Sequence, residues 1–241
     1  MPECPGPSHV GRRGGAAALA AALLAIMTAC APRFDTPGPA LTAPVLTDTA
    51  FVAADGRRLA LARHDADNPR AVVVAAHGFN DYSNAFHLAG PWFAERGITL
   101  IAPDQRGFGD TPTSGIWAGG AAMASDLATL TRAVKSAYPD TPVVLLGASM
   151  GAAVATLAVT DHAALADGLI LSGPAFWGWS AMNPLYRASL WTAAHIAPGW
   201  RLTGEGLGLW PSDNMDMLRA LSRDPKMIRE TRTDTIYGLV T

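Results

Sequence analysis

Short apolar runs alternate with longer, helix-favouring stretches through most of this chain. Four of the runs predict buried strands of a parallel sheet: residues 71–76, 98–102, 143–146 and 168–172. The stretches around them have the length and propensity of helices: residues 83–96, 121–137 and 150–163. Strands that alternate with helices predict an α/β fold, with helices covering both faces of a mostly parallel sheet.

Two local features refine this pattern. Residues 51–54 and 57–63 flank an Asp-Gly pair and predict a β-hairpin, because Asp-Gly supplies the positive φ angles of a tight turn. In the helix at residues 83–96, Ser83 is suited to the N-cap and the glycine after Arg96 to the stop. Pro91 interrupts that helix, so we expect a kink or two pieces.

A serine lies between the apolar run at residues 143–146 and the helix that follows. Residues 147–151 read Gly-Ala-Ser-Met-Gly, the pattern of a nucleophile elbow when a strand precedes it and a helix follows. Glycine is needed on both sides, because side chains there would collide with strand and helix. In a chain with 24 glycines the bare pattern also arises by chance, but its flanks favour Ser149 as a nucleophile. The amide of Met150, at the helix N-terminus, is a candidate donor to an oxyanion.

A second oxyanion donor is expected in the loop after residues 71–76. That loop begins His-Gly-Phe, and a backbone amide at this point of an α/β-hydrolase completes the oxyanion hole. Gly78 allows a tight backbone turn, so the N–H of Phe79 is the candidate. We interpret His77 as structural, its ring bonded to nearby backbone, because in this arrangement the catalytic base follows the nucleophile.

The N-terminus has the features of an export signal. Two arginines precede a charge-free apolar run at residues 14–29, so residues 1–29 predict a secretory signal peptide. The run ends Met-Thr-Ala before Cys30, which resembles the bacterial lipobox with Met in place of the usual Leu. The resemblance implies that Cys30 carries lipid and that the protein is an exported lipoprotein anchored to a membrane of the cell envelope, facing the periplasm. An ordinary cleaved signal or an uncleaved anchor is the alternative. Residues 30–47, rich in Pro, Ala and Thr, predict an extended linker that holds the domain off the surface.

Composition and charge exclude several other classes of protein. With 18 basic and 20 acidic residues, the net charge of −2 gives no electrostatic basis for binding nucleic acid. The two cysteines both lie in the first thirty residues and build neither a disulfide framework nor a zinc site. The acidic loop after residue 103 lacks the ligands of a metal site, and an ion pair between Asp104 and Arg106 explains it better. Asp126 and Arg132 are expected on solvated helix faces. We expect no metal and no cofactor.

Four motifs follow one another along the chain: His-Gly-Phe at 77–79, Asp-Gln-Arg-Gly-Phe-Gly at 104–109, the elbow at 147–151, and Leu-Ser-Gly-Pro-Ala at 171–175. Together they resemble the monoacylglycerol lipase and lysophospholipase branch of the α/β-hydrolases, grouped with serine aminopeptidase (S33) domains. The resemblance covers residues 48–241. It implies Ser149 as nucleophile, Phe79 and Met150 as oxyanion donors, and a lipid ester as substrate.

By the same resemblance, residues 48–173 form the N-terminal part of the hydrolase core and residues 174–241 form a helical cap inserted after the sixth strand. Large apolar side chains crowd the cap: Phe176, Trp177, Trp179, Trp191, Trp200, Leu207, Leu209 and Trp210. They are either the cap's own small core or an apolar mouth for an acyl chain. Within the cap, residues 212–214 predict an N-cap for a helix at 215–222, and Asp-Pro at 224–225 begins another to about Val240.

The acid and base of a hydrolase triad have no clear candidates in this sequence. His162 lies at the far end of the elbow helix, and His195 lies in the cap with no acid to orient it. In the family that this chain resembles, both residues come later, after two further strands, so the chain looks like a C-terminally truncated hydrolase with an exposed apolar sheet edge. Three functions stay open: a serine ester hydrolase, a non-catalytic lipid-binding lipoprotein or pseudoenzyme, and a peptidase of the same superfamily.

Overall fold

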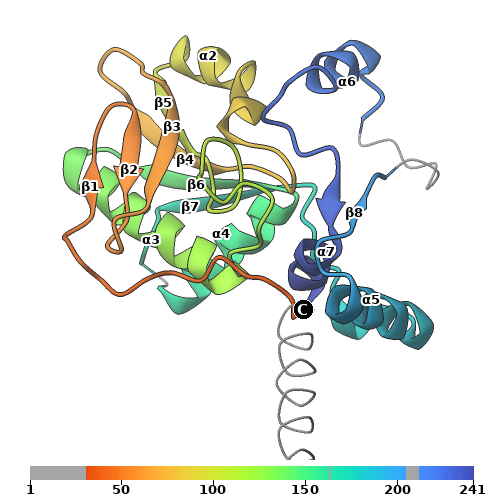
Figure 1. Ribbon diagram of the computed structural model, residues 1–241. Coiled ribbons are helices and arrows are strands. Elements are labelled where there is room, and N and C mark those ends of the chain that lie inside the picture. Colours follow the sequence, from red (N-terminus) through yellow and green to blue (C-terminus); the bar gives the residue numbers. More distant parts are fainter. Residues whose placement is uncertain (1–30, 163, 205–211) are drawn as a thin grey trace, which may run out of the picture.

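A seven-stranded sheet forms the centre of the protein (Figure 1). The computed structural model describes residues 31–162, 164–204 and 212–241, so the predicted signal peptide and Cys30 lie outside the described residues. The strands lie in the order β1-β2-β3-β5-β4-β6-β7. Their bounds are β1 Val45–Leu46, β2 Ala50–Val52, β3 Arg58–His64, β4 Ala71–Ala76, β5 Ile98–Pro103, β6 Val143–Ala148 and β7 Gly168–Ser172.

The sheet combines an antiparallel hairpin with a parallel half. Strands β5, β4, β6 and β7 pair in parallel, and β3 joins them antiparallel to β5. The predicted hairpin is confirmed: β2 pairs with β3, and Gly56 takes a positive φ of 81° in the turn between them, whereas Asp55 does not. All six predicted strands are present, and the two-residue β1 is an addition inside the predicted linker.

Helices cover the sheet on both sides, as expected for continuous apolar strands. On one face α3 (Gly120–Ala137) and α4 (Met150–Asp161) pack against Val72 and Val74. On the other face η1 (Ser83–Phe86) and α2 (Ala89–Ala94) contribute Phe86 and Phe93 to a second cluster around Val73. Because successive residues of a strand point to opposite faces, one apolar run supplies both cores.

The helix predicted at residues 83–96 is divided into η1 and α2, one of the two outcomes expected from Pro91. Proline stands third in α2, inside the first turn, where its missing N–H costs least. The prediction of Ser83 as N-cap is wrong. Tyr82 is the N-cap residue and makes no side-chain cap, while the Ser83 amide donates to the buried carboxylate of Asp104 at 2.9 Å.

Strand β7 lies at one edge of the sheet. It pairs only with β6 among the described strands, and Leu169, Ile170 and Leu171 are exposed along it. Large apolar side chains on an open strand edge match the exposed apolar edge expected from the sequence.

The cap follows β7 and is only partly helical. It contains η2 (Trp179–Ala181), α5 (Pro184–Ile196), β8 (Arg201–Leu202), α6 (Met215–Leu221), β9 (Thr231–Arg232) and α7 (Thr233–Val240). The helix predicted from Asp-Pro at 224–225 to Val240 is wrong in its first half. Thr231 and Arg232 instead pair with β8, so the helix begins only at Thr233 and lies against α5.

Residues 33–42, here termed the N-terminal strap, run along the core. The strap is extended, as the linker prediction has it, but it does not stand off the domain. The Asp35 amide donates to the Trp117 carbonyl at 2.8 Å, and the Gly38 amide donates to the Asp55 carboxylate at 3.1 Å. The amides of residues 41 and 42 both donate to the Ala54 carbonyl. These bonds fix the strap to two loops of the core. Across the described residues, none of the helices has the length and hydropathy that crossing a bilayer requires.

Candidate active site

Ser149 stands at a sharp turn between β6 and α4. Its φ of 51° and ψ of −116° fall outside the regions that non-glycine residues favour. The surroundings hold this backbone: the Ser149 amide donates to the carbonyl of Ser172 at 2.9 Å, and its carbonyl accepts from Ala152 and Ala175 at 3.0 and 3.2 Å. Strained backbone of this kind persists where neighbours determine it, which is typical of a nucleophile elbow.

The glycines of the elbow are required by close backbone contacts. A Cβ on Gly151 would lie 2.1 Å from the carbonyl oxygen of Ala76 at the end of β4. A Cβ on Gly147 would lie 2.4 Å from Cα of Ala152. Both distances are shorter than real Cβ atoms show, so neither position accepts a side chain unless the backbone moves. The pattern at 147–151 therefore has the geometric cause that its spacing predicts.

The loop after β4 lies directly beside the serine. A Cβ on Gly78 would lie 3.4 Å from the Ser149 Cβ, and Phe79 lines the same cavity as Ser149 and Met150. Among the described residues, the backbone amides of Phe79 and Met150 donate to no partner. The structure thus brings together the three residues that the sequence singles out, with two amides available to an oxygen beside Ser149.

His77 holds this loop in place, in agreement with its interpretation as a structural residue. The ring is fully buried, its Nε2 accepts from the Gln105 amide at 2.9 Å, and its Nδ1 lies 2.8 Å from the Gly78 carbonyl. Because Nε2 accepts, Nδ1 carries the proton and donates to the Gly78 carbonyl. Burial lowers the pKa of His77 to about 4, so the ring is neutral at ordinary pH. The Gln105 side chain returns a bond to the His77 carbonyl at 2.7 Å.

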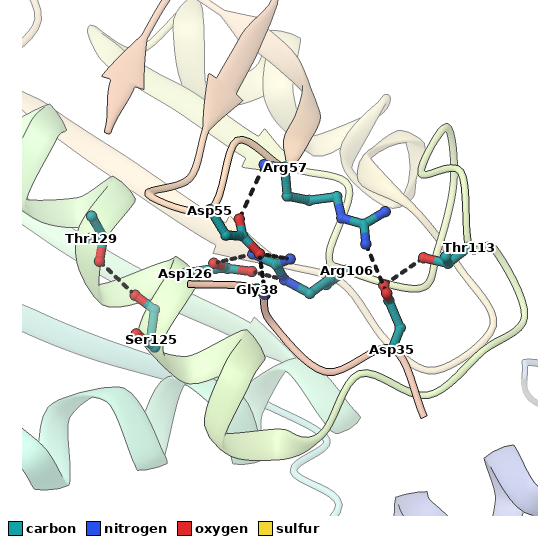
Figure 2. Close-up of polar contacts among 9 residues, drawn as sticks. All are labelled: Asp35, Gly38, Asp55, Arg57, Arg106, Thr113, Ser125, Asp126 and Thr129. Atoms are coloured by element: carbon teal, nitrogen blue, oxygen red, sulfur yellow. Dashed lines mark hydrogen bonds and ion pairs between the residues drawn. The ribbon is translucent and has the colours of Figure 1, made fainter. Parts of the chain in front are cut away.

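The prediction of an Asp104–Arg106 ion pair is wrong. Arg106 is buried between Asp55 of the hairpin turn and Asp126 of α3, with N–O distances of 2.7 and 3.1 Å to the first and 2.7 and 3.0 Å to the second (Figure 2). Asp104 instead accepts from the backbone amides of Ser83 and Asp110. Asp104 and Arg106 bond to different partners, although only one residue separates them in the sequence.

The prediction that Asp126 lies on a solvated face is also wrong. Its carboxylate accepts hydrogen bonds from the buried guanidinium of Arg106. Burial raises the pKa of Asp126, and the hydrogen bonds from Arg106 oppose this. Burial also raises the pKa of Asp55, but the guanidinium and the amides of Arg57 and Gly38 outweigh it and lower the value to about 2. Arg132 is exposed, as expected.

A cavity of about 480 Å³ opens beside Ser149, lined by apolar side chains from core and cap. The lining includes Trp117, Leu157, Trp177, Leu239 and Val240. This size and lining are typical of pockets that take a small molecule or an acyl chain.

Some aromatic residues of the cap line the cavity, and others pack within the cap, so each of the two interpretations drawn from the sequence fits part of them. Trp177 lines the cavity, whereas Trp179 packs edge-on against Tyr237, and Trp191 stacks on His195 at 4.2 Å. Trp200 is exposed. Leu207, Leu209 and Trp210 lie outside the described residues.

Sequence reasoning missed two residues that shape this cavity. Trp117 lies near the end of the long loop between β5 and α3 and packs edge-on against Phe79, with ring centroids 6.3 Å apart. Gly238 of α7 faces it so closely that a Cβ would lie 2.2 Å from the indole. The available signal was a glycine inside a predicted helix. Glycine there lowers the stability of the helix, so its presence indicates that a neighbouring group needs the space.

The structure brings no described histidine to the serine. Among the residues described, Ser149 forms no side-chain hydrogen bond. His162 is the exposed C-cap of α4, and the His195 Nδ1–H donates to the Trp191 carbonyl at 2.7 Å in the cap. Within the same described ranges, no group of three or more His, Cys, Asp or Glu side chains is placed to hold a metal ion.

The sheet order, the covering helices and the elbow define the α/β-hydrolase class, and solved structures agree. A soluble variant of monoglyceride lipase from Saccharomyces cerevisiae, in complex with a substrate analogue, superposes with a TM-score of 0.65 at 22% identity, over 85% of this chain and 69% of that one. A thermostable carboxyl esterase from Bacillus coagulans, in complex with glycerol, gives 0.62 at 25% identity, over 83% and 72%.

The chain belongs to the family described as serine aminopeptidase, S33 (Hydrolase_4), whose profile matches residues 67–241. The monoacylglycerol lipase of Mycolicibacterium smegmatis is 27% identical over 168 residues, which cover 69% of this chain and 56% of that protein. A monoglyceride lipase homologue of monkeypox virus is 31% identical over 113 residues, 44% of this chain and 39% of that protein. The chain therefore spans about half the length, or less, of the curated relatives it matches. The resemblance drawn from the four motifs is confirmed.

Proposed function

We propose that this chain carries the nucleophile of a serine ester hydrolase that cleaves esters of single-chain lipids. The observation that carries the proposal is the meeting of Ser149, the two available amides of Phe79 and Met150, and an apolar cavity. Acyl transfer needs these three things in one place: a nucleophile, donors for the developing negative charge, and a surface that holds the acyl chain.

In the proposed reaction, Ser149 Oγ attacks the ester carbonyl while a base takes the hydroxyl proton. The oxyanion of the tetrahedral intermediate accepts hydrogen bonds from Phe79 and Met150, and the partial positive charge at the N-terminus of α4 adds to its stabilisation. The intermediate collapses to an acyl-serine as the alcohol leaves with the proton. Water, activated by the same base, then releases the fatty acid and restores Ser149.

This mechanism has one requirement beyond the described residues. No described histidine bonds to Ser149, so a histidine base and the carboxylate that orients it must come from outside them. Without a base, the hydroxyl of a serine at neutral pH is a weak nucleophile.

The proposed substrate class rests on the lining of the cavity. Trp117, Leu157 and Val240 offer apolar surface to an acyl chain, while the Ser149 end carries the polar groups. The names of the relatives, monoacylglycerol and monoglyceride lipases, agree with a glycerol ester as substrate. A cavity of about 480 Å³ has the size of pockets that bind small molecules.

A second candidate function is lipid binding without turnover. The observation that favours it is the isolation of Ser149 from every described histidine, combined with a cavity that suits a fatty acid. A binding protein needs the cavity alone, and the elbow would then be an inherited feature of the fold.

A fluorophosphonate probe separates the two functions, because it reacts with a serine only when a base activates it. The hydrolase predicts labelling of the full-length protein expressed from its gene, none of its Ser149→Ala variant, and turnover of a monoacylglycerol that follows the labelling. Ser172→Ala is the matched control, since Ser172 bonds to the Ser149 amide through its backbone carbonyl, which alanine keeps. Fatty acid binding with neither labelling nor turnover would decide for the binding protein.

We further propose that Cys30 carries the lipid that anchors the protein to a membrane of the cell envelope. The support is the sequence alone: an apolar run that ends in small residues before a cysteine. Metabolic labelling with a radioactive fatty acid tests it. Incorporation into the wild type and its loss in Cys30→Ser is the expected result, and equal incorporation into both refutes the assignment.

A further inference from the structure

The loop after β4 makes a tight turn at one of the two candidate oxyanion donors. The Asp81 amide donates to the Gly78 carbonyl at 3.4 Å, so Phe79 and Asn80 are the two central residues of a β-turn. Asn80 takes a positive φ of 62°, as type II turns require at the second central position, where glycine or asparagine usually stands. The backbone of Asn80 therefore sets the course of the chain directly after Phe79.

The peptide unit that contains the Phe79 N–H is held by the core on its carbonyl side. Because a peptide unit is planar, the direction of the Phe79 N–H depends on that of the Gly78 carbonyl. The His77 ring donates to this carbonyl at 2.8 Å and is itself bonded to the Gln105 amide. The core thus anchors the turn before Phe79, and the residue that anchors it after Phe79 is Asn80.

Asn80 is bonded to the cap through both its backbone and its side chain. Its carbonyl accepts from the Ile228 amide at 3.0 Å, and its Nδ2 donates to Thr231 Oγ1 of β9 at 2.6 Å. The buried Oδ1 of the same amide has no partner among the described residues, so the bond to Thr231 is what holds this side chain there. Thr231 is 6% exposed, and a bond that is shielded from water in this way is stronger than one at the surface.

Residues 224–231, here termed the clasp segment, are bonded to the core at further points. The segment lies between α6 and the end of β9 (Figure 1). Its Asp224 accepts from the Tyr82 hydroxyl at 2.6 Å, and its Lys226 pairs with Asp110 at 2.6 Å. Ile228 packs against the hydrophobic core of the sheet. The clasp segment is therefore a fixed support for the loop, since it bonds to Asn80 and to Tyr82 two residues further on.

We propose that Asn80 is a positioning residue for the reaction at Ser149, because its bond to Thr231 holds the Phe79 amide where the oxyanion forms. The inference rests on the proposed function and deepens it, since it names the side chain that aligns one of the two donors. Alignment matters because a donor stabilises an oxyanion only at a distance of about 2.7–3.1 Å. The oxyanion hole is then complete only while the clasp segment lies against the loop.

Steady-state kinetics with a short-chain ester test this assignment in the full-length protein expressed from its gene. Asn80→Gly keeps the positive φ without strain and removes the side-chain amide, and Thr231→Val replaces the hydroxyl by a methyl group. Each is expected to lower kcat about tenfold while KM stays within about twofold, because loss of a whole oxyanion donor costs about 10²–10³ and its displacement costs less. Thr231→Ser keeps the hydroxyl and should retain kcat within about twofold of the wild type.

The matched control is Thr233→Val, two residues further along the cap. Thr233 is also buried, and its hydroxyl donates to the Ala197 carbonyl at 2.6 Å within the cap. This variant should lower the melting temperature about as much as Thr231→Val and leave kcat unchanged. The double variant Asn80→Gly/Thr231→Val should lose no more than either single variant, because both remove the same bond. An unchanged kcat in Asn80→Gly or Thr231→Val, losses that multiply in the double variant, or an equal loss in Thr233→Val overturns the proposal.

A measurement without substrate separates this assignment from the proposed function. In protein labelled with ¹⁵N-phenylalanine, the NMR resonance of the Phe79 amide should shift in Thr231→Val and keep its position in Thr233→Val. A Phe79 resonance that does not move in Thr231→Val overturns the positioning role. If the wild-type protein neither reacts with the fluorophosphonate probe nor turns over ester, the proposed function fails, whereas the resonance still decides whether the bond to Thr231 positions Phe79.

Discussion

The buried ion network around Arg106 gives the sharpest prediction of stability. Arg106 is 1% exposed and bonds through four N–O contacts of 2.7–3.1 Å to Asp55 and Asp126 (Figure 2). The substitution Arg106→Met keeps an unbranched side chain, shortens it by the guanidinium end and removes its charge. It leaves two partly buried carboxylates facing one another without a cation, which is the costly way to break such a network.

The magnitude follows from the burial. Removing one partner of a buried ion pair costs about 3–5 kcal/mol, which is a large part of the roughly 5–15 kcal/mol that stabilises a typical domain. At about 2–4 °C per kcal/mol for a chain of this size, we expect the melting temperature to fall by about 6–20 °C. Asp126→Asn should cost less, because Arg106 keeps Asp55 as its partner.

The dependence on pH identifies the cause. Burial already raises the pKa of Asp126 while Arg106 opposes the rise, so removing Arg106 raises it further. An acid with a higher pKa in the folded than in the unfolded state destabilises the fold as the pH rises through that pKa. The loss in Arg106→Met should therefore be larger at pH 7 than at pH 4.

Urea unfolding followed by circular dichroism measures these differences directly. The control is Arg96→Met, since Arg96 is exposed, pairs with Glu95 at 3.7 Å on the surface, and should cost about 1 kcal/mol or less. The double variant Arg106→Met/Asp126→Asn should recover part of the stability by removing one of the two opposed charges. A cost for Arg106→Met no larger than that for Arg96→Met, or one that does not change with pH, would refute this account.

Three further predictions follow from the site and its supports. Gly151→Val should abolish fluorophosphonate labelling of Ser149, because even a Cβ would lie 2.1 Å from the Ala76 carbonyl. His77→Phe should lower kcat about tenfold or more with a smaller effect on KM, since displaced oxyanion donors cost up to 10²–10³ in rate, and an unchanged kcat would contradict the positioning role. Asp55, with a pKa of about 2 against an ordinary 3.8, should stabilise the fold fully above pH 4 and progressively less as the pH falls to 2; Asp55→Asn should remove this acid limb from the stability profile.

Local rules were sufficient for the sheet and for the elbow. Strands β4 and β7 have the predicted bounds, because continuous apolar runs between polar breaks leave little choice of register or length. The elbow was predictable because its geometry depends on five consecutive residues and their two flanks. The position of His77 before the serine in the sequence was enough to interpret it as structural, and its contacts with Gln105 and Gly78 agree with this.

Contacts between distant residues account for the predictions that are wrong. Arg106 was paired with its near neighbour Asp104, whereas its partners lie 51 and 20 residues away. The helix predicted after Asp-Pro at 224–225 is cut short by pairing of β9 with β8, which no local propensity encodes. In both cases tertiary partners decide among conformations that are locally acceptable.

The same distinction separates the two parts of the proposed function. The nucleophile is fixed by adjacent residues, but the cavity around it depends on α7, which is held by Thr235 bonding to the Gly115 carbonyl and by Asp234 bonding to the strap at Arg33. One short helix therefore contacts both the strap and the cavity. The proposed nucleophile can therefore be identified from a five-residue motif, whereas the cavity beside it depends on contacts that only the fold creates.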